Sequence, residues 1–213
     1  MRTLLLLAVA SVGVGLLACG GSAGVDAGAG GGGGSAAGGG TAAGDCAGYC
    51  ADIASNCSGA SAQWVTTEAC LTECAVWPVG ASADVAGNTL GCRRHWAQVA
   101  AADAGAGCPA AGPSGGDQDV ADSAPGTCGE GCESFCAVAQ AVCTAGNTQF
   151  GGVPACLAVC KTFKPSSAPY STADTGKNDF GCRVYHLGAA AQSPAAAVTH
   201  CPHIAATSSV CTN

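Results

Sequence analysis

The chain has 213 residues, of which charged side chains make up 10% and glycine supplies 34. Seventeen cysteines in so short a chain indicate a disulfide scaffold rather than a large apolar core. The formal net charge of −7 argues against a nucleic-acid-binding protein, because contact with phosphates requires clustered lysine and arginine.

Residues 1–18 predict a lipoprotein signal peptide. Met1 and Arg2 form a short basic start, and an uncharged, leucine-rich run of 16 residues follows from Thr3 to Ala18. This run is short for a helix that crosses a bilayer, which needs about 20 residues. We therefore expect the segment to direct export and then to be removed.

The leader ends in Leu16-Leu17-Ala18-Cys19, which resembles the lipobox of bacterial lipoproteins. The resemblance implies cleavage before Cys19 and attachment of several acyl chains there, which hold a protein to a membrane more stably than one chain does. Gly20 follows the cysteine, which implies sorting to the outer membrane of a Gram-negative cell. The alternative is an ordinary secretory signal with Cys19 in a disulfide. Loss of Cys19 leaves sixteen cysteines, an even number that can all pair.

Residues 19–45 predict a lipidated cysteine followed by a disordered, flexible tether. Thirteen of the 26 residues after Cys19 are glycine, and most others are alanine or serine. Such a segment buries too little apolar surface to offset its ordering entropy. A flexible coil of this length spans roughly 25–30 Å, enough to hold a folded body away from a membrane.

The remaining chain carries one cysteine pattern twice, which predicts two tandem modules: module 1, residues 46–128, and module 2, residues 129–213. The first four spacings between cysteines are 4, 7, 13 and 4 in both copies. The cysteines are Cys46, Cys50, Cys57, Cys70, Cys74, Cys92, Cys108 and Cys128, then Cys132, Cys136, Cys143, Cys156, Cys160, Cys182, Cys201 and Cys211. We expect four disulfides within each module. Zinc bound by cysteines is the alternative, but an exported protein oxidises its thiols.

Helical spacing predicts a mainly α fold with about three helices in each disulfide-stapled module. In module 1 cysteines and apolar residues share one helical face over residues 46–57, a second helix follows Thr66 through 70–77, and a third covers about 91–102. Module 2 repeats the three patterns. No run of alternating β-branched residues indicates a sheet. Residues 112–126, which contain three aspartates, predict a flexible acidic loop at the end of module 1.

Two helices that each carry Cys-x-x-x-Cys predict a stapled hairpin, because residues four apart share one helical face. The expected bridges are Cys46–Cys74, Cys50–Cys70, Cys132–Cys160 and Cys136–Cys156 for the hairpins, Cys57–Cys92 and Cys143–Cys182 for the third helices, and Cys108–Cys128 and Cys201–Cys211 for the C-terminal loops. Eight cysteines allow on the order of a hundred connectivities, so this pairing is a hypothesis.

The motifs Cys-x-x-Tyr/Phe-Cys, Gln-Trp/Phe, Cys-Leu-x-x-Cys, Gly-Cys-Arg and Cys-Pro recur in this order. Together they resemble cysteine-rich lipoproteins that are abundant in myxobacteria, over both modules. That family has no established activity, so the resemblance implies an exported, lipid-anchored protein and no particular chemistry. Module 1 departs from the pattern, since Cys201-Pro202-His203 corresponds there to Cys108-Pro109-Ala110.

Polar residues that recur around the third helix are the candidates for a ligand site: His95, His186, Asp84, Asp174, Arg93 and Arg183. The two histidines match only if one gap is allowed; without a gap His95 matches Tyr185. The structural alternative is that the aspartates and the nearby asparagines cap the helix and shape the loop that leads into it. His200 and His203 flank Cys201 in module 2 only and are a possible metal-binding pair. No acidic ligand lies beside them, so we expect no metal and no other cofactor.

Motifs of known enzymes are absent from the sequence, including Cys-x-x-Cys, G-x-S-x-G and H-E-x-x-H. We therefore expect a non-catalytic outer-membrane lipoprotein, anchored through Cys19, that displays its modules for interaction or adhesion with a protein or matrix partner. Two alternatives remain. One is a module that binds a small ligand or a metal through His186, His200 and His203, and the other is an envelope enzyme or redox accessory protein.

Overall fold

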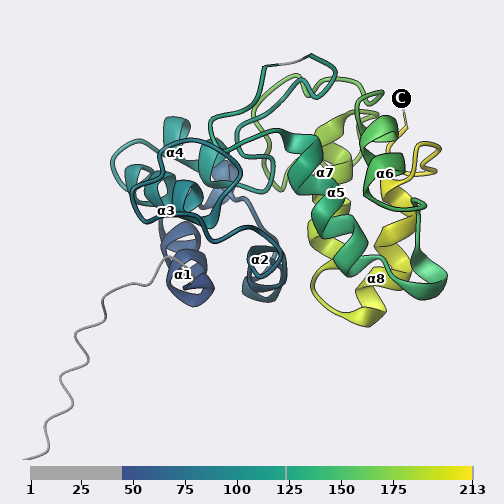
Figure 1. Ribbon diagram of the computed structural model, residues 1–213, viewed down its shortest axis with the longest axis horizontal. Helices are drawn as coiled ribbons and strands as arrows, with labels where there is room; N and C mark the ends of the chain where they lie inside the picture. Colours follow the sequence, from purple (N-terminus) through teal and green to yellow (C-terminus); the bar gives the residue numbers. More distant parts are fainter. Residues whose placement is uncertain (1–44, 123, 213) are drawn as a thin grey trace, which may run out of the picture. The chain divides into compact units, whose positions relative to one another are not determined.

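The computed structural model describes residues 45–122 and 124–212, and its regular structure is helical (Figure 1). Within these ranges there is no strand, and one isolated bridge joins Gly126 to Gly129. The predicted mainly α fold is thus confirmed. The signal peptide, Cys19 and the tether as far as residue 44 lie outside the described residues.

Each module contributes four α-helices to the described structure. Module 1 contains α1 (Cys46–Asn56), the 3-10 turn η1 (Gly59–Ser61), α2 (Thr67–Cys74), α3 (Leu90–Val99) and α4 (Ala104–Ala111). Module 2 contains α5 (Gly131–Val142), η2 (Ala145–Asn147), α6 (Val153–Cys160), α7 (Phe180–Ala190), α8 (Pro194–His200) and η3 (Cys201–Ile204). The prediction of about three helices missed α4 and α8. Helix α4 is mostly alanine and glycine with an internal proline, and α8 begins with proline and carries three alanines among its seven residues, so neither shows an apolar stripe of large side chains.

Short polar side chains begin several of these helices. Thr66 caps α2 as predicted, since its side chain accepts a hydrogen bond from the backbone N–H three residues later at 3.2 Å. The predicted caps of α3 and α7 are wrong, since Thr89 and Asp179 make this contact instead. The expected role in the entry loops is confirmed, because Asp84 and Asp174 accept backbone hydrogen bonds there. Asp84 orients the capping residue Thr89, because it accepts a hydrogen bond from the Thr89 hydroxyl at 2.9 Å.

Eight disulfides join the sixteen described cysteines, four within each module as predicted. The four hairpin bridges are confirmed, namely Cys46–Cys74, Cys50–Cys70, Cys132–Cys160 and Cys136–Cys156. The other four predicted pairs are wrong, and the bridges are Cys57–Cys108, Cys92–Cys128, Cys143–Cys201 and Cys182–Cys211. The missed fourth helix explains the error in module 1, because α4 packs against α1 and brings Cys108 to Cys57.

Each module has its own small core around three aromatic rings. In module 1 Tyr49 meets Trp64 and Trp77 edge-on, with ring centroids 5.9 and 6.0 Å apart. In module 2 the corresponding residue, Phe135, meets Phe150 and Phe163 in the same way at 6.2 and 5.9 Å. Such pairs contribute about 0.5–1.5 kcal/mol each beyond the area that they bury. Because a disulfide contributes about 2–4 kcal/mol, the bridges rather than these small cores dominate stability.

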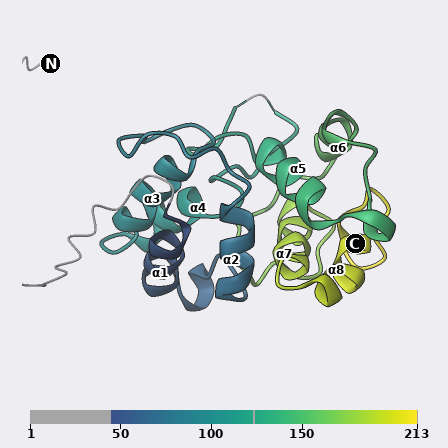
Figure 2. The ribbon, with the colours of Figure 1, turned by 60° about the horizontal axis from the view of Figure 1, so that its bottom comes forward.

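The two modules share an interface within one compact unit that contains all described residues. Helix α2 lies beside α7 (Figure 2). Across the boundary the Trp77 indole N–H donates to Ser134 Oγ at 3.0 Å, and the Gln63 side chain donates to the Tyr170 carbonyl at 3.0 Å. The modules therefore interlock through specific polar contacts.

The acidic loop 112–126 is largely packed, so the prediction of a flexible loop is wrong for its first half. Residues 112–115 are buried, as are Asp117 and Val120. Asp117 accepts a hydrogen bond from the backbone N–H of Gly131 at 2.8 Å, and the Pro113 carbonyl accepts one from the Ser134 hydroxyl at 2.9 Å. The loop thus fills the junction between the modules.

A buried glutamate lies at the same junction. Glu73 on α2 is 1% exposed. Its Oε1 faces α7, since a Cβ added to Gly188 of that helix would lie 3.3 Å from it. This oxygen makes no hydrogen bond. Burial raises the pKa of this carboxyl from 4.5 to about 8, against the opposing effects of Trp64 and Arg93. Glu73 is therefore protonated at neutral pH in the folded protein.

We expect Glu73 to make stability fall as the pH rises from 4.5 to about 8, because the folded protein binds its proton more tightly than the unfolded chain. Up to about pH 6.5 the lowered pKa values of His186 and His200 act in the opposite direction, so the net decline should appear above that pH. Below pH 4.5 the Glu73 carboxyl is protonated in both the folded and the unfolded protein, and above about pH 8 it is ionised in both. The contribution of Glu73 to the pH dependence of stability therefore ends at these limits. Glu73→Gln is neutral at every pH and should therefore abolish this decline in the free energy of unfolding, as measured by urea denaturation. Glu68→Gln, an exposed change on the same helix, is the control and should leave the decline in place.

Candidate metal centre

The recurring aspartate, asparagine and arginine residues make structural contacts within the fold. Arg93 is fully buried, stacks over the Trp77 ring at 4.1 Å and donates to Asn88 Oδ1 at 2.9 Å. In module 2 Arg183 stacks over Phe163 at 4.2 Å and donates to Asn178 Oδ1 at 3.1 Å.

The aspartates of the predicted ligand site lie in the loops before the third helices. Asp84 bonds to Thr89 and to the Ala81 backbone, and Asp174 accepts from the Ser171 backbone N–H at 3.4 Å and pairs with Lys177 at 3.6 Å. Each aspartate therefore has local partners of its own.

The two predicted histidines are not equivalent. Cys92 and Cys182 occupy the same position at the start of α3 and α7, so His186 corresponds to Trp96 and His95 to Tyr185. The match that needs a gap is therefore wrong. His95 packs its ring against Trp96, with the centroids 5.5 Å apart.

Three histidines of module 2 converge on one point. His186 lies on α7, His200 ends α8 and His203 lies in η3. The Nδ1 atom of His186 is 3.0 Å from Nδ1 of His200 and 3.3 Å from Nδ1 of His203. One ring nitrogen from each of the three residues lies within 4.8 Å of the others. This is the geometry of ligands that surround a single ion.

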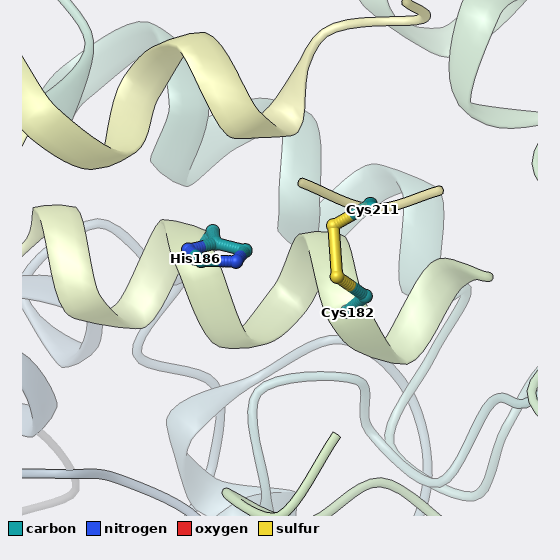
Figure 3. A group of neighbouring side chains, drawn as sticks. All are labelled: Cys182, His186 and Cys211. Atoms are coloured by element: carbon teal, nitrogen blue, oxygen red, sulfur yellow. A yellow bond between two sulfur atoms is a disulfide. The ribbon is translucent and has the colours of Figure 1, made fainter. Parts of the chain in front are cut away.

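Disulfides fix the segments that carry these side chains. Cys201, bonded to Cys143, stands between His200 and His203 and is fully buried. On α7, Cys182 lies one turn before His186 and is bonded to Cys211 (Figure 3). Both sulfur atoms near His186 are therefore used in a covalent bond, which leaves the three imidazoles as the ligand set.

Two of the three histidines, His186 and His200, have lowered pKa values that favour the uncharged state. The pKa of His186, which is 5% exposed, falls from 6.5 to about 4, first through burial and then through the neighbouring His203 and His200, while the Thr175 backbone acts in the opposite direction. Burial also lowers the pKa of His200, with His203 as the second cause. Neutral imidazole offers the lone pair that a metal ion requires.

Module 1 has no such cluster, although its disulfide frame is the same. The positions of His186, His200 and His203 correspond to Trp96, Gly107 and Ala110, counted from the paired cysteines. A Cβ at Gly107 would collide with the backbone of Ala100, because α4 approaches α3 closely there. Module 1 thus has no room for the second histidine.

The sequence pointed to these three histidines only as an alternative, because no carboxylate stands near His200 or His203. Three imidazoles can hold zinc without one, with the fourth coordination position left open. What the sequence did not reveal is the packing of α8 and η3 on α7, which brings His186 to the other two.

Residues 43–122 match the model of the BfoA family C-terminal domain. The matched segment spans the helices of module 1 and ends before module 2, so it contains none of the three clustered histidines. No curated protein and no solved structure matches the chain. The match, together with the bridges of module 1, supports the expected small disulfide-rich helical domain.

Proposed function

We propose that this chain is a non-catalytic lipoprotein of the bacterial outer membrane that presents two interlocked disulfide-rich modules to a protein or matrix partner. The observation that carries the proposal is the covalent frame, eight bridges distributed through both modules of one compact unit. Disulfides at this density are typical of small exported domains, which cannot draw enough stability from their cores.

The leader supports the membrane part of the proposal. Its basic start, leucine-rich run and Leu16-Leu17-Ala18-Cys19 are the features that export and lipid attachment require. Among the described residues, no helix has the length and apolar character to cross a bilayer. An acyl anchor on Cys19 is therefore the attachment that we propose, in keeping with the resemblance to myxobacterial lipoproteins.

Intact-mass analysis of the mature protein from its native membrane tests the anchor. We expect a chain that begins at Cys19, carries added acyl mass and has no free thiol, since the other sixteen cysteines are paired. Cys19→Ser should prevent acylation and release the folded body from the membrane fraction. An unmodified Cys19, or a chain that keeps the leader, would contradict the proposal.

The interaction role is tested in the same pair of strains. Adhesion of cells to their extracellular matrix should fall when Cys19→Ser replaces the native protein, provided that equal amounts of disulfide-bonded protein are made. Unchanged adhesion would count against the role as a displayed interaction module. Activity that depends on a single side chain would count against the non-catalytic assignment.

A further inference from the structure

We infer that His186, His200 and His203 form a binding site for one divalent transition-metal ion, with three imidazole ligands and a fourth position open. This goes beyond the proposed display function, which requires no metal. The site belongs to module 2 alone, since Trp96, Gly107 and Ala110 occupy the equivalent positions of module 1.

The spacing of the nitrogen atoms fits a tetrahedral ion. With metal–nitrogen distances of about 2.0–2.1 Å, two ligands on a tetrahedron lie about 3.3 Å apart. The two separations from His186 Nδ1, 3.0 and 3.3 Å, are close to this value, and the ligand nitrogens of all three residues lie within 4.8 Å of one another. The side chains are therefore already arranged for coordination.

Hydrogen bonding among the rings cannot account for the arrangement. A neutral imidazole nitrogen either donates one proton or accepts through one lone pair. His186 Nδ1 has two close nitrogen neighbours and can satisfy only one of them. In addition, His186 Nε2 is buried without a hydrogen bond of ordinary geometry, and the Thr175 backbone is the neighbour that favours the protonated ring. A metal ion at the centre would satisfy all three Nδ1 lone pairs at once.

The ligand set also selects the kind of ion. Imidazole nitrogen suits Zn²⁺, Cu²⁺ and Ni²⁺, whereas Ca²⁺ and Mg²⁺ prefer oxygen ligands. His200 and His203 are partly exposed, so an ion can enter from their side while His186 closes the buried side. Three protein ligands leave one position for water or a ligand from a partner.

The test is equilibrium dialysis of the purified, oxidised full chain against Zn²⁺ and, separately, Cu²⁺, followed by metal analysis. We expect one equivalent bound per chain, and a thiol titration should confirm that no free cysteine contributes. His200→Ala and His203→Ala should each lower the affinity about 100-fold or more, a larger loss than changes to residues that only orient the ligands usually produce. Both residues are partly exposed, so the variants should fold.

The chain offers one matched control, because its fourth histidine, His95, lies in module 1. His95→Ala should leave the affinity unchanged. Nitrogen NMR should show Zn²⁺-dependent shifts of Nδ1 at His186, His200 and His203 and none at His95. Binding of less than a tenth of an equivalent at micromolar metal, or full binding by a folded His200→Ala/His203→Ala variant, would overturn the inference.

Discussion

Replacement of Cys143 and Cys201 together by serine should lower the free energy of unfolding by about 4 kcal/mol. This bridge joins residues 58 positions apart, the longest separation among the eight. Opening it returns the most conformational freedom to the unfolded chain. Because Cys201 also stands between His200 and His203, we expect the variant to lose affinity for Zn²⁺ as well.

The Cys136–Cys156 bridge provides the control for this prediction. Its separation of 20 residues gives an expected loss of about 3 kcal/mol, and it lies in the hairpin of α5 and α6, which carry none of the three histidines. Removal of this pair should therefore weaken folding slightly less and leave Zn²⁺ affinity unchanged in the folded protein. Guanidinium denaturation and dialysis measure the two effects. Equal loss of affinity in both variants would show that the Cys201 bridge does not position the ligands.

Arg93→Ala should destabilise the protein by about 3–5 kcal/mol. The buried guanidinium donates to the Gly112 carbonyl at 3.3 Å, to Asn88 Oδ1 at 2.9 Å and to Ser134 Oγ at 3.2 Å. Truncation leaves these acceptors without their donor and removes the cation that stacks on Trp77. Since Ser134 lies in module 2, the change should also loosen the junction between the modules.

Arg183→Ala is the matched control for Arg93→Ala. Its partners are Asn178 and the carbonyls of Asp179 and Ala206, which all lie in module 2, and its Nε makes no hydrogen bond. We expect Arg183→Ala to lower the free energy of unfolding, measured by urea denaturation, less than Arg93→Ala does. Arg93→Ala should also increase proteolysis near residue 130, whereas Arg183→Ala should not. The opposite ranking would mean that Arg93 does not join the modules.

Much of the fold could be predicted because the cysteine spacing is itself periodic. Cysteines at positions i and i+4 mark one helical face, so the hairpins of α1 with α2 and of α5 with α6, and their four bridges, follow from the sequence. Helices α4 and α8 could not be found in the same way, since alanine and glycine give no apolar stripe. Four wrong disulfide pairs followed from this omission.

The candidate site shows the same limit. The pair formed by His200 and His203 is visible in the sequence, because both residues flank one cysteine. The contribution of His186 depends on how α7 packs against α8 and η3, a long-range contact that no local pattern encodes. The junction residues Ser134 and Glu73 were missed for a related reason. A serine and a glutamate on helices ordinarily face solvent, and only tertiary packing buries them here.

The close approach of α4 to α3 at Gly107 has a consequence for how the repeat can change over time. A histidine cluster like that of module 2 would need histidine at positions 96, 107 and 110, and the change at 107 alone would force these helices apart, because a side chain there meets the backbone of Ala100. Module 1 therefore cannot acquire the histidine cluster of module 2 through a series of single substitutions. Copying module 2 as a whole offers a route to a protein with two such centres.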